Sequence, residues 1–175
     1  MPPRKPDPVS MLKKDHQTVK KLLNQLVKAD GRSERQRLFE QIRHEITVHS
    51  RLEEEIFYPA FKESAKTGKD EELFYESNEE HALVDHLLET MAEGDFESDE
   101  FAGKARVLRE LVQEHIKEEE SDMFPKAKRY LGDEVEELGE RMTERREELM
   151  SEIGGAAKGQ PRQGGRQQEE PETAA

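Results

Sequence analysis

Residues 49–59 read HSRLEEEIFYP, and residues 115–125 read HIKEEESDMFP. The two stretches share a histidine, glutamates four and five residues after it, an aromatic residue nine after it and a proline ten after it. A second pair matches in the same way, because residues 15–23 read DHQTVKKLL and residues 80–88 read EHALVDHLL. The members of the first pair are 66 residues apart and those of the second pair are 65 residues apart, so the two spacings differ by one residue. The chain therefore contains a duplicated pair of segments.

Apolar residues recur every three or four positions in five stretches, which are residues 12–26, 38–56, 73–91, 101–123 and 135–149. This period predicts amphipathic helices, and no segment shows the sustained alternation of a strand. We expect helices to stop at Asp30-Gly31 and Gly94-Asp95, and to run up to Pro59 and Pro125. Short connections favour antiparallel neighbours. The sequence predicts an all-α fold, an up-down-up-down four-helix bundle with a pseudo-two-fold axis, plus a C-terminal helix.

The ends of the chain differ in composition from its middle. Residues 1–8 hold four of the eight prolines, and residues 154–175 are rich in Gly, Gln and Glu without apolar periodicity. We expect both ends to be disordered tails. Residues 9–130 are then the bundle, and residues 131–153 form the C-terminal helix.

The composition excludes several classes of protein. The chain has 175 residues, a net charge of −13 and no cysteine, so it has no disulfide, no cysteine-ligated zinc and no thiol nucleophile. We expect neither a signal peptide nor a membrane-spanning stretch, and an acidic chain is a poor ligand for a phosphate backbone. We expect a cytoplasmic protein that binds neither nucleic acid nor membrane. Leu, Ile, Val and Phe make up only 35 residues, which suggests that a bound group contributes to stability.

Four histidines and two glutamates lie on or beside the apolar stripes, and they are His16, His49, Glu53, His81, His115 and Glu119. Residues three or four apart share one face of a helix, so these side chains point into the bundle. A buried carboxylate costs several kcal/mol unless it is paired or binds a metal. Imidazole and carboxylate together suit iron, manganese or zinc, and a carboxylate from each half can bridge two ions. The pattern predicts a metal centre on the bundle axis.

Other metal motifs agree less well with the sequence. Residues 44–49 resemble the zincin motif but carry one residue too many for both histidines to share a helix face. No candidate histidine follows a glutamate by three residues, as the ferritin-like di-iron signature requires. His44 and His86 lie about 140° around the helix from candidate ligands and are interpreted as non-ligands. Glu54 and Glu120 have intermediate positions and stay as additional candidates.

The residues around 15–16, 49–59, 80–81 and 115–125 resemble the hemerythrin-like HHE cation-binding domain over residues 9–130. The resemblance implies a left-handed four-helix bundle around a non-haem di-iron centre bridged by carboxylates and an oxygen atom. It implies four terminal ligands, which are His16, His49, His81 and His115. It also implies two bridging ligands, which are Glu53 and Glu119. Members of this family carry or sense dioxygen, handle nitric oxide, peroxide or iron, or repair iron centres.

The chain departs from the oxygen-carrying members at two places. They have two histidines four residues apart on the third helix, whereas Ser77 and Asp85 lie four residues either side of His81. They also have an aspartate five residues after the last histidine, where this chain has Glu120. Asp85 is a candidate seventh ligand. A set richer in carboxylate favours the oxidised metal, which argues against reversible oxygen carriage.

Three functions therefore stay open. The first is a di-iron protein that handles or senses dioxygen, peroxide, nitric oxide or iron in stress response or iron homeostasis. The second is a peroxide-consuming, catalase-like enzyme with a di-iron centre, and the third is a metal-independent interaction bundle. In the first two the partner is a small diatomic or peroxide ligand, and the sequence does not identify a protein partner. Four residues are expected to pack in the core beside the centre: Phe57, Tyr58, Met123 and Phe124.

Overall fold

The computed structural model describes residues 6–158, with side chains through residue 153, and these residues form five helical rods. The first rod is α1 (Pro8–Leu26). The second is α2 (Arg32–Leu52), which continues through the π-helical turn η1 (Glu53–Phe57) into α3 (Tyr58–Ser64). The third is α4 (Gly68–Ala92). The fourth runs from α5 (Asp99–Glu118) through the π-helical turn η2 (Glu119–Met123) into α6 (Phe124–Leu131), and the fifth is α7 (Glu134–Lys158).

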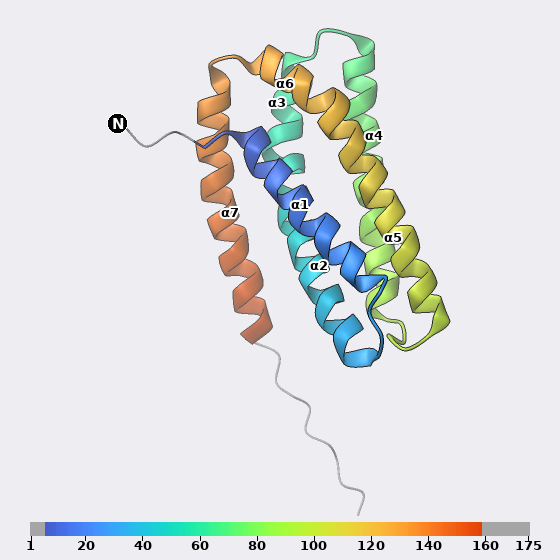
Figure 1. Ribbon diagram of the computed structural model, residues 1–175. Helices are drawn as coiled ribbons and strands as arrows, with labels where there is room; N and C mark the ends of the chain where they lie inside the picture. The colour runs from blue at the N-terminus through green and yellow to red at the C-terminus, as the bar shows by residue number, and fades with distance from the viewer. Residues whose placement is uncertain (1–5, 159–175) are drawn as a thin grey trace, which may run out of the picture.

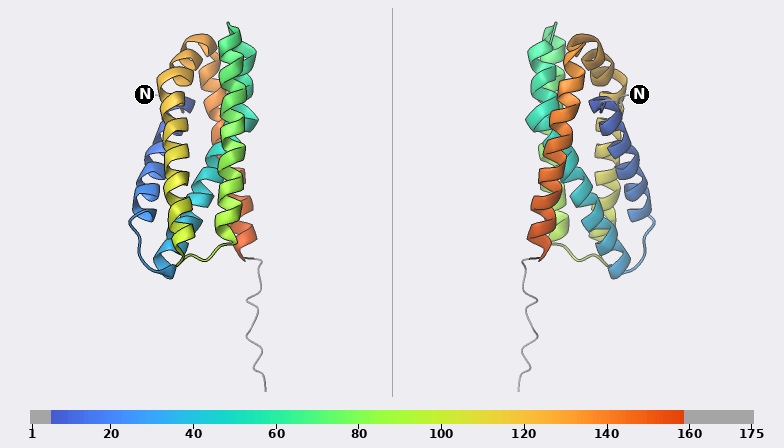
Figure 2. Two further views of the ribbon diagram at one scale, coloured as in Figure 1. Left: turned by 90° about the vertical axis from the view of Figure 1, so that its right-hand side faces the viewer. Right: turned by 90° about the vertical axis from the view of Figure 1, so that its left-hand side faces the viewer.

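The first four rods form the bundle that the sequence predicts, and the all-α fold is confirmed for the described residues (Figure 1). Within the bundle, α1 packs on α2 and on α5, α4 packs on α5, and α3 packs on α4. The fifth rod, α7, packs on α1 and α2, with α4 and α5 on the far side of the bundle (Figure 2). The added helix therefore covers one half of the duplicated bundle.

Short polar residues cap the starts of α1 and α4. Asp7 accepts a hydrogen bond from the Val9 amide at the start of α1, at 3.1 Å. Thr67 and Asp70 form a reciprocal capping box at the start of α4, which satisfies two amides that lack helical partners. Gly31 separates α1 from α2 with a φ of 79°, a conformation that glycine adopts at little cost. The predicted helix stops at Asp30-Gly31 and Gly94-Asp95 are confirmed.

The two prolines of the repeat do not end their helices, contrary to the prediction. Pro59 and Pro125 each lie in the first turn of a helix that continues from a π-helical turn. The amides of Tyr58 and Phe124 donate to carbonyls five residues earlier, those of Glu53 and Glu119. A proline lacks the amide hydrogen and its ring clashes with the carbonyl four residues back. The wider π turn relieves both problems, so the rod continues.

The described residues also show where the C-terminal helix lies. Gly132, at a φ of 52°, follows α6, so α7 begins at Glu134 rather than at residue 131. It runs to Lys158, so residues 154–158, predicted as tail, are helical. Residues 1–5 and 159–175 of the predicted tails lie outside the described residues. No described helix is both long and apolar enough to cross a bilayer.

The core consists of two apolar clusters with a polar layer between them. One cluster joins the start of α1 to α3, α6 and α7, and the other joins the end of α1 to the ends of α2, α4 and α5 remote from the prolines. On α1, Leu12 belongs to the first cluster and Val19 to the second, with His16 between them. The predicted ligands therefore lie in a layer sealed above and below by apolar packing.

Candidate metal centre

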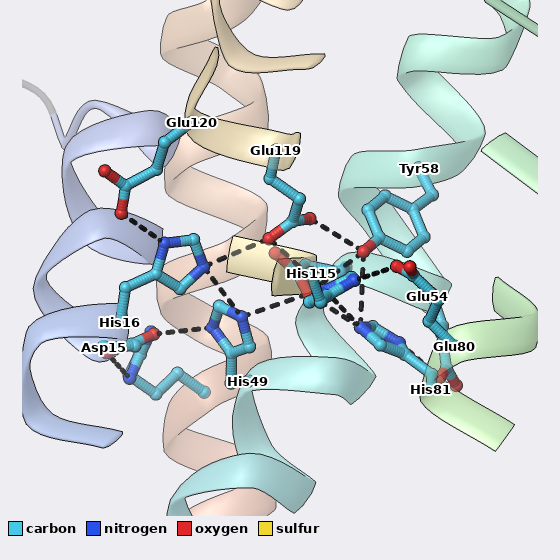
Figure 3. Close-up of polar contacts among 12 residues, drawn as sticks. Asp15, His16, His49, Glu54, Tyr58, Glu80, His81, His115, Glu119 and Glu120 are labelled. Carbon is cyan, nitrogen blue, oxygen red and sulfur yellow. Dashed lines mark hydrogen bonds and ion pairs between the residues drawn. The ribbon is translucent and has the colours of Figure 1, made fainter. Parts of the chain in front are cut away.

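Six side chains from four rods converge in this polar layer. The imidazoles come from His16 on α1, His49 on α2, His81 on α4 and His115 on α5, and the carboxylates from Glu53 on η1 and Glu119 on η2. All six are buried, and both glutamates have no exposed surface. Figure 3 shows the labelled imidazoles and Glu119 directed toward a common point. The structure thus brings together every residue that the sequence predicts as a principal ligand.

Each buried carboxylate contacts two imidazoles, one from each half of the repeat. Oε2 of Glu53 lies 3.1 Å from Nε2 of His49 and 3.3 Å from Nε2 of His81. Oε2 of Glu119 lies 3.1 Å from Nε2 of His16 and 3.4 Å from Nε2 of His115. The imidazoles pair through the same nitrogens, at 3.2 Å for His16 with His49 and 3.1 Å for His81 with His115. The donor atoms are therefore arranged as two clusters connected by carboxylates.

Both carboxylates project from a π-helical turn, which the sequence analysis did not predict. Glu53 begins η1 and Glu119 begins η2, at the same position of the repeat. A π turn inserts one extra residue into a helix and occurs frequently at functional sites. Within each turn, the first glutamate is buried while the next is only half-buried. The turn therefore separates two adjacent acids into an inner and an outer role.

The outer nitrogen of every imidazole faces a carboxylate. Nδ1 of His16 lies 2.8 Å from Glu120, and Nδ1 of His81 lies 2.9 Å from Glu54. The other two pairs are His49 with Asp15, at 3.5 Å, and His115 with Glu80, at 2.6 Å. An ionised carboxylate only accepts hydrogen bonds, so each Nδ1 is the donor. A neutral imidazole then directs the lone pair of Nε2 into the bundle, as a metal ligand requires.

The charges of the centre shift the pKa values of its groups. Burial by itself lowers the pKa of His49, but the Glu53 carboxylate, with Asp15, outweighs it and raises this pKa to about 10. Burial also opposes the charge on His81, yet hydrogen bonds to Glu53 and Glu54 raise its pKa to about 9. Burial raises the pKa of Glu53, whereas His49 and His81 together hold it well below its usual range. Without a cation, protons on imidazole therefore balance the buried carboxylates.

The donor set is suited to metal ions. Among the described residues, Oε1 of Glu53 and Oε2 of Glu119 are buried oxygens without a hydrogen-bond donor, apart from the imidazole contacts of Glu119, and such an oxygen carries a desolvation cost. Two groups of donor atoms each lie close enough together to bind one ion. Position 1 consists of His16, His49, Glu53 and Glu119. Position 2 consists of Glu53, His81 and His115. A cation at each position would satisfy the orphaned oxygens, with Glu53 common to both.

The hydroxyl of Tyr58 also belongs to the centre, although the sequence predicts only core packing for this residue. The Tyr58 hydroxyl donates to Oε1 of Glu119 at 2.8 Å and lies 3.3 Å from Nε2 of His81. Burial, with the charges of Glu119 and Glu53, raises its pKa well above the usual value. The matched residue is Phe124, whose ring stacks on His16 with centroids 5.5 Å apart. The repeat shows an aromatic pair, but only the contacts show that one hydroxyl enters the centre.

The remaining sequence candidates lie outside the two positions. Glu54 and Glu120 bond the outer imidazole nitrogens, and Asp85 is exposed. His86 is also exposed, and Nε2 of His44 lies 3.2 Å from Sδ of Met150, on the outside of the bundle. These five residues are therefore not among the donors that converge on the axis.

A small cavity adjoins the imidazoles. Its volume is about 20 Å³, and its walls are the four histidines, Ser50 and five aliphatic side chains: Val19, Ile46, Val84, Val112 and Ile116. A space of this size holds about one water-sized molecule. The aliphatic walls provide no hydrogen-bonding groups, so specificity for an occupant would come from the polar layer.

Comparisons with known proteins agree with this arrangement. Residues 7–127 match the model of the hemerythrin HHE cation-binding domain family. A crystal structure described as a hemerythrin HHE cation-binding domain-containing protein, the Rv2633c homolog from Mycobacterium kansasii, superposes with a TM-score of 0.75. It is 25% identical, and the match covers 87% of this chain and 93% of that one.

Two curated relatives add to these matches. The uncharacterised protein Rv2633c of Mycobacterium tuberculosis is 31% identical over 144 residues, which cover 79% of this chain and 84% of the relative. A protein of Nostoc named DNA nickase is 27% identical over 150 residues, which cover 85% of this chain. The match spans only 42% of the nickase.

Proposed function

Because this chain belongs to the hemerythrin HHE cation-binding domain family, we propose that its centre binds two non-haem iron ions and exposes them to a small oxidant. The observation that carries this proposal is the convergence of four imidazoles and two carboxylates, Glu53 and Glu119, each of which has one buried oxygen that, apart from imidazole contacts, has no hydrogen-bond donor among the described residues. His16 and His49 would hold one ion and His81 and His115 the other. Glu53 and Glu119 would bridge the two, because each already contacts imidazoles of both halves.

The charges around the centre support an oxidised, highly charged metal pair. Six carboxylates either enter the centre or bond its imidazoles: Asp15, Glu53, Glu54, Glu80, Glu119 and Glu120. A carboxylate on the outer nitrogen raises the basicity of an imidazole ligand. Negative charge and basic ligands both stabilise the ferric state over the ferrous state. This environment supports reaction with an oxidant rather than reversible carriage of dioxygen, which requires a stable ferrous state.

The cavity supports a ligand of few atoms. Its volume of about 20 Å³ admits dioxygen, nitric oxide or hydrogen peroxide but no organic substrate. When bound, the iron pair would supply electrons to such a ligand or accept them from it. The protein would exclude bulk water with the two apolar clusters and hold protons at the hydroxyl of Tyr58 and at the imidazoles.

Among small oxidants, hydrogen peroxide is the second and more specific candidate, and Tyr58 favours it. Disproportionation converts two molecules of peroxide into one of dioxygen and two of water, so it needs no outside reductant. It does require protons to be moved between oxygen atoms. The Tyr58 hydroxyl donates to Glu119 inside the centre, so a hydroxyl that could pass a proton between Glu119 and a peroxide oxygen lies where the reaction would occur. We propose no nucleic-acid function, because the charge is −13 and the nickase match is partial.

Metal analysis of the full chain tests the proposal. Protein from iron-replete cells is expected to hold about two irons per chain and to show a near-ultraviolet oxo-to-iron charge-transfer band. Replacement His49→Ala should remove the band and most of the iron. His44→Ala is the matched control, because His44 lies on the same helix outside the centre, and it should retain both.

Two further measurements separate the open functions. A chelator should lower the melting temperature of the iron-loaded protein, because the free energy of metal binding adds to that of folding. Unchanged melting after complete removal of iron would instead favour a metal-independent interaction bundle. Dioxygen release from added peroxide, present in wild type and His44→Ala but absent in His49→Ala, would support the catalase-like reaction.

A further inference from the structure

The carboxylates on the outer imidazole nitrogens differ between the two halves of the repeat. Asp15 and Glu80 occupy matched positions, and so do their partners His49 and His115. The carboxylate of Glu80 nevertheless lies 2.6 Å from Nδ1 of His115, whereas that of Asp15 lies 3.5 Å from Nδ1 of His49. A hydrogen bond of 3.5 Å is at the weak limit for this pair of atoms. The hydrogen bond between His49 and its carboxylate is therefore much weaker than the one between His115 and its carboxylate.

Arg146 of α7 provides one cause of this difference. Its Nη2 donates to Oδ2 of Asp15 at 2.5 Å and its Nη1 donates to Oδ1 at 3.1 Å. Such a bidentate, charge-assisted pair is among the strong hydrogen bonds of proteins. The oxygen that receives the shorter bond is also the one that faces His49. Among the described residues, Glu80 has no ion pair with a lysine or an arginine, so only the first half of the centre has this competing cation.

The sequence of α7 places Arg146 at this point without depending on it to dock the helix. Leu138, Met142 and Leu149 are buried in the first apolar cluster. Arg146 follows Met142 by four residues and precedes Leu149 by three, so it lies on the docking face. The apolar contacts hold α7 against α1 and α2. Removal of the guanidinium should therefore leave the helix in place, which makes its electrostatic effect measurable.

We propose that Arg146 is a positioning residue that makes the two cation positions unequal, by drawing Asp15 away from His49 and neutralising its charge. This inference rests on the proposed metal function. With Arg146 in place, Nε2 of His49 is a weaker metal ligand than Nε2 of His115. The cation at position 1 is therefore bound less tightly than it would be without Arg146. Without Arg146, Asp15 can close on His49, and an uncompensated negative charge lies beside position 1. The fifth helix thus tunes one ion of the pair and leaves the other unchanged.

The test is a titration of the full metal-free chain with Zn²⁺ alone, followed by NMR of the imidazole nitrogens and their protons. Zinc accepts the same ligands and is diamagnetic. Replacement Arg146→Met should lower the dissociation constant of position 1 about tenfold, the size of effect that outer ligand partners have. It should also move the Nδ1 proton of His49 downfield, toward that of His115. Position 2, reported by His81 and His115, should keep its wild-type constant.

Three companion variants make the result decisive. Arg145→Met removes ion pairs with Glu55, Glu148 and Glu152 on the outer surface and should match wild type. Arg146→Lys keeps a charge without the bidentate geometry and should lie between wild type and Arg146→Met. Asp15→Glu in the wild-type background lengthens the acid; if it alone reproduces the whole effect of Arg146→Met, side-chain length rather than Arg146 causes the inequality, and the proposal is wrong.

Two other outcomes would also overturn it. If Arg146→Met leaves the constant of position 1 and the His49 proton unchanged while wild type binds two ions, Arg146 only helps to attach α7. If wild type from iron-replete cells holds no iron and its imidazoles show no response to Zn²⁺, the metal function itself fails, and this inference fails with it. The two failures differ in the wild-type titration alone.

Discussion

The two halves of the bundle have matched ligands but different surroundings. The α1–α2 half is covered by α7, and its His49 has a carboxylate shared with Arg146. No helix of the described residues packs over the α4–α5 half as α7 does over the first half, and its His115 has a short bond to the half-exposed Glu80. Tyr58 lies nearer the imidazole of the second half, where it approaches His81, while Phe124 stacks on His16 of the first. The comparison shows that a duplicated ligand set does not make two equal metal positions.

The two halves place their metal ligands in the same way but surround them with different neighbours. Each half supplies two imidazoles and one carboxylate from the same positions of the repeat. The neighbours that differ between the halves are Arg146 on α7, a helix outside the repeat, the acids Asp15 and Glu80, and the aromatic residues Tyr58 and Phe124. We therefore expect changes to the shared donors to affect both halves alike, and changes to the neighbours to affect one half only.

The largest expected effect comes from the bridging carboxylates. Glu53→Gln and Glu119→Gln each keep the size of the side chain but remove its charge, so each should reduce iron from about two per chain to less than one. The two losses should be equal, because each carboxylate contacts one imidazole of each half. Elemental analysis gives the result, with the exposed Glu55→Gln as control. Loss in only one variant would break the symmetry of the comparison.

A smaller effect is expected in the pH dependence of the metal-free protein. The pKa of His49 is raised from 6.5 to about 10 and that of His81 to about 9. A raised pKa contributes stability that is complete below pH 6.5 and is lost as the pH rises through the folded-state values. The free energy of unfolding should therefore decrease between about pH 7 and pH 10 in chemical denaturation.

Iron binding should show the opposite dependence on pH, since imidazole must lose its proton to bind a metal. NMR titration of the metal-free chain should show His49 and His81 both losing their protons well above pH 6.5. A stability that increases over this range, or imidazoles that titrate at or below pH 6.5, would contradict the charge balance described for the centre.

The smallest effect is expected from the aromatic pair. Tyr58→Phe makes this aromatic position alike in the two halves and removes one buried hydroxyl, at a cost of about 1 kcal/mol in stability. Iron content should stay at the wild-type level, whereas dioxygen release from peroxide should decrease if the hydroxyl supplies protons. Phe124→Tyr, which adds a hydroxyl beside His16, provides the complementary variant. Equal peroxide activity in wild type and Tyr58→Phe would restrict Tyr58 to a structural role.

The sequence alone determined the helical fold, the duplication and the six principal donors. These features depend on local spacing: an apolar period of three to four residues defines a helix face, and a histidine with a glutamate four residues later shares that face. The matched positions of His49 with Glu53 and of His115 with Glu119 then predicted one centre, which the structure assembles.

Only the tertiary structure decided how the donors are oriented and tuned. The π turns that carry Glu53 and Glu119 depend on how each rod accommodates a proline while its ends stay packed. The carboxylates on the imidazoles, the hydroxyl of Tyr58 and the guanidinium of Arg146 reach the centre from other helices, separated in sequence by up to 131 residues. Helical periodicity states which face a residue occupies but not which neighbour packs against that face, and that choice belongs to the assembled bundle.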